Sequence, residues 1–139
     1  MSEAPPQLPP PANRALLPTF AAVTFLATLT AYWGVLSLAL DRDVVDYPDA
    51  SALLGPAMAG AAGVITWIVL LRMPGARHPW PGAVASAVLS LLGMLAVAAF
   101  GYDPVAVLHF AISPFILGAA ALSALTVLAT WAINPPARR

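Results

Sequence analysis

The sequence predicts an all-α integral membrane protein, built as a single bundle of four transmembrane helices. Two observations predict this class. Of the 139 residues, 60% are hydrophobic and only 9% are charged, whereas soluble domains carry about 25% charged residues. The hydrophobic residues also fall into four long runs that contain no Asp, Glu, Lys or Arg. Each run is near the length of about 20 residues that a membrane-spanning helix requires.

The four runs define the domain organisation. The predicted helices cover about residues 16–40, 50–71, 83–100 and 105–133. Helices are expected because backbone polar groups in lipid need partners within the segment, and four short strands cannot close a barrel. Together the runs make one transmembrane domain over residues 15–133. Residues 1–14 are rich in proline and are expected to form a disordered cytoplasmic tail, followed at the other end of the chain by a short basic tail over 134–139.

The arginines predict the orientation of the chain. Five of them flank one set of helix ends: Arg14, Arg72, Arg77, Arg138 and Arg139. Only Arg42 lies at the other set. The positive-inside rule therefore predicts that both termini and the loop over 72–82 are cytoplasmic. The lack of Lys and the abundance of Ala and Pro indicate a GC-rich coding sequence and a bacterium. The expected location is the bacterial inner (cytoplasmic) membrane, which the chain crosses several times.

The segment DRDVVDYPDA, residues 41–50, holds four of the six acidic residues. In the predicted topology it is a loop on the outer side, where acidic residues are readily accommodated. The spacing of Asp41, Asp43 and Asp46 does not match a calcium-binding loop, which also needs a bidentate Glu. The sequence therefore predicts no dedicated metal site here, and leaves open a weak surface contact with a cation.

Small residues predict where the helices touch, because they allow close backbone approach in lipid, where little hydrophobic force acts between helices. Each run carries small or hydroxyl residues at a spacing of about i, i+4, i+7 and i+11, including Thr66 and Ser86. The residues assigned to helix packing are Gly34, Gly55, Ala59, Gly63, Ser90, Gly93 and Ser123. Trp33 lies deep in the first run and is expected to pack against a neighbouring helix or lipid.

One ionisable residue lies within the runs, and such residues are candidates for function. This residue is His109, with Ser113 at i+4 and Asp103 six residues earlier. The three could bind a proton, a metal or a haem iron next to a kink at Pro114. The alternative is an interfacial His that bonds Ser113, a backbone carbonyl or lipid headgroups. Because a lone imidazole cannot build a zinc site and His78 is predicted on the other side of the membrane, we expect no metal and no cofactor.

The composition also narrows the function. A net charge of zero argues against nucleic-acid binding, which needs a basic face. The runs hold no carboxylate pair, no phosphate-binding Gly-rich loop and no serine with an adjacent base, so we expect no enzyme. We predict a small non-catalytic membrane protein: an accessory or assembly subunit of a larger bacterial membrane complex. Its expected partners are membrane lipids and other membrane subunits. The alternative is a small homo-oligomeric channel or transporter.

Overall fold

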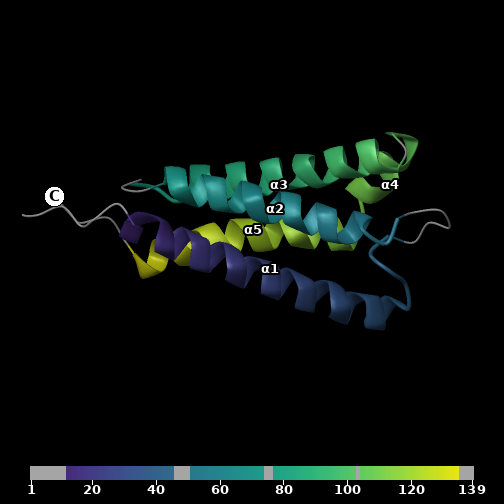
Figure 1. The fold of residues 1–139 in the computed structure, drawn as a ribbon, viewed down its shortest axis with the longest axis horizontal. Coiled ribbons are helices and arrows are strands. Elements are labelled where there is room, and N and C mark those ends of the chain that lie inside the picture. Colours follow the sequence, from purple (N-terminus) through teal and green to yellow (C-terminus); the bar gives the residue numbers. More distant parts are fainter. Residues whose placement is uncertain (1–11, 46–50, 74–76, 103, 135–139) are drawn as a thin grey trace, which may run out of the picture.

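In the computed structural model, the described residues are 12–45, 51–73, 77–102 and 104–134, and all their regular elements are helices (Figure 1). The elements are α1 (Ala12–Leu40), α2 (Leu54–Arg72), α3 (Trp80–Gly101), the 3₁₀ turn η1 (Pro104–Ala106), α4 (Val107–Ala111) and α5 (Pro114–Ile133). Four of them, α1, α2, α3 and α5, are long and apolar enough to cross a membrane. The all-helical prediction is confirmed, and the four long helices are those expected of a multi-pass membrane protein.

The end of α1 explains one of the clustered aspartates. Asp41 has φ = 49°, in the left-handed region that glycine favours and that Asp and Asn tolerate. The backbone N–H of Arg42 donates to the carbonyl of Ser37 over 3.3 Å, as in the motif that commonly closes a helix. Asp41 therefore has a structural role at the C-terminal end of α1.

The fourth apolar run is not one kinked helix over 105–133, and this prediction was wrong. The run is divided into η1, α4 and α5, with a break between α4 and α5. Proline disfavours helical geometry in the residue before it, and Ser113 accordingly has an extended backbone with φ = −66° and ψ = 133°. Pro114 then becomes the first residue of α5, where its missing N–H costs no helical hydrogen bond.

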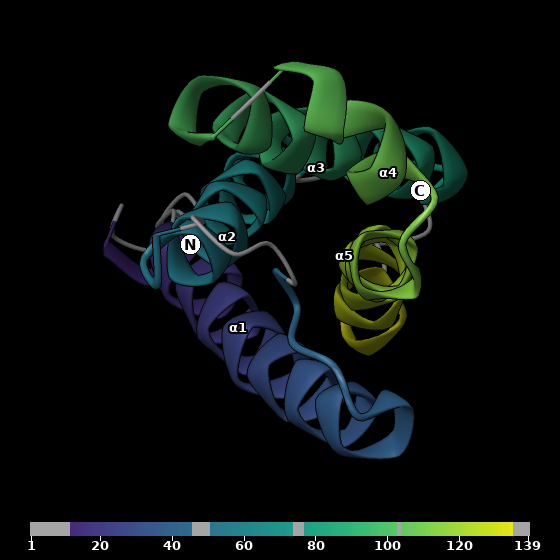
Figure 2. The same cartoon turned by 90° about the vertical axis from the view of Figure 1, so that its right-hand side faces the viewer.

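The helices form a bundle in which α3 packs extensively on both α2 and α5, and α1 packs on α2 and α5. The end of α1, the start of α2 and the short helix α4 lie together at one end of the bundle, called here the α4 end (Figure 1). Toward the α4 end, α1 leans away from α2 and passes below the start of α5 in the view of Figure 2.

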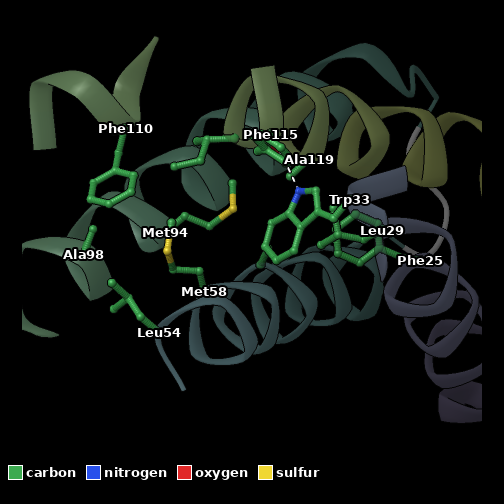
Figure 3. Packing of buried hydrophobic residues seen from close by; sticks show 12 residues of the cluster. Phe25, Leu29, Trp33, Leu54, Met58, Met94, Ala98, Phe110, Phe115 and Ala119 are labelled. Carbon is green, nitrogen blue, oxygen red and sulfur yellow. Dashed lines mark hydrogen bonds between the residues drawn. The ribbon is translucent and has the colours of Figure 1, made fainter. Parts of the chain in front are cut away.

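The main hydrophobic core lies in the half of the bundle nearer the α4 end. Figure 3 shows the packing of its side chains. Its buried members are Phe25, Leu29, Trp33, Leu54, Met58, Ala62, Met94, Ala98, Phe110, Phe115, Ile116 and Ala119. A smaller cluster of Leu70, Ala83 and Val127 lies toward the opposite end. In lipid such clusters stabilise the bundle through close packing rather than through the release of water.

Candidate functional site

Four hydroxyl side chains meet inside the bundle. They are Thr66 of α2, Ser86 and Ser90 of α3, and Ser123 of α5, and each is fully buried. The Oγ of Ser123 lies 2.8 Å from Oγ1 of Thr66, 2.5 Å from Oγ of Ser86 and 3.1 Å from Oγ of Ser90. Three of the predicted small-residue stripes therefore converge on Ser123.

The directions of these bonds follow from the single proton of each hydroxyl. Thr66 donates to the carbonyl of Ala62 over 2.8 Å, so it must accept from Ser123. Ser123 has then used its proton and accepts from both Ser86 and Ser90. All four protons are held by acceptors within the chain. The hydroxyl cluster thus links α2, α3 and α5 and carries no ionisable group.

A second set of polar contacts fastens α1 to the start of α5. The hydroxyl of Tyr32 donates to the carbonyl of Pro114 over 2.9 Å. The indole Nε1 of Trp33 donates to the carbonyl of Phe115, also over 2.9 Å (Figure 3). Gly118 makes the first contact feasible, because a Cβ there would overlap the Tyr32 ring. These contacts pull the second half of α1 toward α5.

Arg42 adds a charged contact at the same place. Its guanidinium carbon lies 5.9 Å from the centroid of the Phe115 ring, within the range of a cation–π interaction. The Arg42 side chain is therefore directed toward α5.

Two of the glycines assigned to packing lie at close helix contacts. A Cβ on Gly63 would lie 2.8 Å from Cδ2 of Leu26, so α1 and α2 approach closely at this level. A Cβ on Gly93 would overlap the end of the Ile65 side chain, so α3 and α2 do the same.

Gly34 and Gly55, which were also assigned to helix packing, are not at helix contacts among the described residues of the chain. A Cβ on either residue would meet no atom within 4 Å. Gly34 is exposed because α1 turns its opposite face, with Phe25 and Trp33, into the core. Gly55 faces an open space, since α1 has leaned away from α2 at this level.

This open space is a cleft of about 810 Å³ between α1, the start of α2 and the described residues that lie next to these two helix ends. The described residues that line it are Leu26, Thr30, Trp33, Asp43, Val44, Val45, Ser51, Ala52, Gly55, Pro56, Ala59 and Gly60. Ala59, which was assigned to packing, is half-buried and packs against the main core, and it also lines the cleft. Sequence reasoning did not predict this cleft.

Among the described residues, no site is assembled around His109. His109 lies on α4 with its side chain exposed, and Asp103 lies outside the described residues. Ser113 is 6% exposed and its Oγ makes no hydrogen bond. The bond expected between His109 and Ser113 is not formed, because the chain leaves the helical path at Ser113. Within the described parts of the chain, no group of three or more His, Asp or Glu side chains could hold a metal ion.

Sequence reasoning also missed the bonds from Tyr32 and Trp33 to α5. The available signal was the pairing of two aromatic donors deep in an apolar run, where an indole N–H or phenol O–H needs an acceptor. A carbonyl at the start of a helix that follows a break is one such acceptor. The position of the break was the missing information.

Comparison with known proteins gives a family but no function. A family model described as "Family of unknown function (DUF6121)" matches residues 12–138. No curated protein and no solved structure shows significant similarity to the chain. Because the match covers nearly the whole sequence, the chain belongs to the DUF6121 family.

Proposed function

We propose that this protein is a non-catalytic accessory or assembly subunit of a larger bacterial membrane complex, which it joins through the outward face of α1. The observation that carries the proposal is a set of exposed small residues on one side of this helix, Thr24, Ala27, Thr28, Ala31 and Gly34. No other described helix of the chain covers them. Small residues let a second helix approach the backbone closely, which is how helices associate in lipid.

This face suits both lipid and a protein partner. The hydroxyl of Thr24 donates to the carbonyl of Phe20, and that of Thr28 donates to the carbonyl of Thr24. Both protons are therefore satisfied within α1, and the helix pays no penalty for an unpaired donor in lipid. Of the four long helices, α1 also buries the smallest share of its residues inside the bundle. It has the most side-chain surface left for a partner.

The interior supports a structural role over transport or catalysis. Its polar groups are neutral hydroxyls whose protons are already bonded within the chain. Transport pathways and catalytic sites in membranes usually depend on ionisable groups. The hydroxyl cluster instead resembles a set of interhelical hydrogen bonds that hold α2, α3 and α5 together.

For the orientation we propose that both termini and the loop over 72–82 face the cytoplasm and that the α4 end faces outward, supported by the arginine distribution. The chain has no cysteine, so the labelling of a single introduced cysteine is not obscured by other thiols of the protein. Asp43→Cys is expected to react with an impermeant thiol reagent in intact cells, and Arg77→Cys is expected to react only after lysis. The reverse pattern would invert the proposed topology.

Substitution on α1 tests the function. Ala31→Leu adds bulk to the proposed face, and Ala96→Leu makes the same change at an exposed position of α3. After extraction in mild detergent, native mass analysis is expected to find other subunits bound to the wild type and to Ala96→Leu, but not to Ala31→Leu. A symmetric assembly of this chain alone would instead favour a homo-oligomeric channel or transporter. Equal binding by both variants would remove α1 as the docking face.

A further inference from the structure

The cleft between α1 and α2 has the dimensions of a ligand site. Its volume of about 810 Å³ falls in the range of about 300–1,000 Å³ typical of small-molecule pockets. The α2 wall is made of small residues, and a Cβ on Gly55 or Gly60 would meet no atom within 4 Å. The space along this wall is therefore not filled by the chain's own side chains.

The polarity of the cleft changes along its length. Leu26 and Trp33 form the α1 wall over about 10 Å of helix, and the hydroxyl of Thr30 between them is already donated to the carbonyl of Leu26. At the α4 end, the lining includes the exposed polar residues Asp43 and Ser51. An apolar interior with a polar mouth suits an amphiphilic ligand. Its hydrocarbon chain would lie among the helices, and its polar headgroup would lie at the membrane surface.

The charge at the mouth of the cleft indicates which kind of headgroup the ligand carries. Asp43 brings a carboxylate to the cleft, and the neighbouring Arg42 is directed to the Phe115 ring. Among the described residues, no cationic side chain forms an ion pair with the exposed Asp43. A cationic group on the ligand would supply the missing opposite charge, and an ammonium with N–H donors could also bond the carboxylate.

We propose that this cleft binds a membrane lipid with a primary ammonium headgroup, of the phosphatidylethanolamine class. One acyl chain lies between Leu26 on α1 and Gly60 on α2, and the ammonium meets the carboxylate of Asp43. This site is separate from the outward face of α1, so the inference does not depend on the proposed function.

Two kinds of variant separate the contribution of the lipid's acyl chain from that of its headgroup. Gly60→Leu, or Gly55→Leu as a second variant, puts a side chain into the cleft. Both are expected to fold, because there is room for the new Cβ and Leu favours a helix more than Gly does. Ala57→Leu, at an exposed position of α2 outside the cleft, is the matched control. Asp43→Asn removes only the charge.

The measurement is titration of the purified full-length protein in detergent with phosphatidylethanolamine, phosphatidylcholine or phosphatidylglycerol of identical acyl chains, followed by native mass spectrometry. The wild type and Ala57→Leu are expected to favour phosphatidylethanolamine over phosphatidylglycerol by about fivefold, the scale of one exposed ion pair. The preference over phosphatidylcholine is expected to be smaller, because its quaternary ammonium keeps the positive charge but has no N–H donor for the carboxylate. Asp43→Asn should abolish this preference but still bind lipid. Gly60→Leu and Gly55→Leu should weaken the binding of all three lipids by about tenfold or more.

Several outcomes would overturn the proposal. Undiminished binding by folded Gly60→Leu and Gly55→Leu would place the lipid outside the cleft. Equal affinity of the wild type for the three lipids, or a preference that survives in Asp43→Asn, would remove the role of the carboxylate. Occupation of the cleft by a second copy of the chain, seen as a dimer lost on Gly60→Leu, would also contradict it.

Discussion

The indole N–H of Trp33 donates to the backbone carbonyl of Phe115, joining the second half of α1 to the first turn of α5 over 2.9 Å (Figure 3). The two residues are 82 positions apart in the chain. Both residues are almost fully buried. Together with the parallel bond from Tyr32, it holds α1 against α5 while α1 leans away from α2.

Trp33→Phe is expected to lower the free energy of unfolding by about 1 kcal/mol, the net value of one buried hydrogen bond, with a further loss from the smaller ring. The Phe115 carbonyl can keep its helical bond, so no buried acceptor is left without a partner. Titration of the purified protein with SDS in mixed micelles measures the change. Tyr32→Phe, which removes only the parallel bond at a more exposed position, should cost less. A larger loss from Tyr32→Phe would contradict this ranking.

Ser123→Ala is expected to cost about 1–2 kcal/mol, because Ser86 and Ser90 lose their acceptor and Thr66 loses a donor. The cost is less than the sum of three bonds, since serines in helices can turn to carbonyls of their own helix. The control is Thr126→Ala, whose hydroxyl bonds only the Leu122 carbonyl of its own helix and should cost less. Equal losses in the SDS titration would mean that the hydroxyl cluster does not link the helices.

Gly63→Leu is expected to cost about 1–3 kcal/mol by overpacking, because a Cβ there already approaches Leu26. Gly34→Leu should leave the unfolding free energy unchanged or slightly raised, since its Cβ meets nothing within the chain. The comparison separates a contact inside the bundle from a position that faces outward. A loss of stability in Gly34→Leu would show that Gly34 does contact another part of the bundle.

His109→Gln and His109→Leu are both expected to leave folded yield and the activity of the host complex unchanged. The side chain is exposed, and the described residues around it do not form a set of ligands. Yield in detergent and growth of the host measure the two properties separately. A well-folded His109→Gln protein in a complex without activity would make His109 a functional residue.

The fold could be predicted to the level of four apolar helices because composition alone decides which segments need the interior of a bilayer. The identity of Ser90 and Ser123 as inward-facing residues also follows from spacing. What spacing could not give is the tilt of each helix. Gly55 and Gly63 on α2 both look like packing residues, yet only Gly63 meets a neighbour, because α1 leans from α2 toward α5. The cleft is a consequence of that tilt.

The break before α5 could not be predicted from the sequence pattern either. Pro114 indicates a disturbance of a helix, but whether the helix kinks or ends depends on the surrounding packing. In this chain the end is favoured because Phe110 and Phe115 on either side of the break both enter the core. As a result, His109 and Ser113 no longer share a helical face, and the candidate site built on that face is lost.

The most direct test of the account is photo-crosslinking from the outward face of α1 in intact cells. A photoreactive amino acid replaces Gly34, and in a second protein it replaces Ala96 on the exposed side of α3. The account predicts a defined adduct between the photoreactive residue at position 34 and a different membrane protein. This adduct is expected to be absent when the photoreactive residue is at position 96, and to be lost when Ala31→Leu is added. Adducts only with lipid at both positions, or equal adducts from both, would contradict it.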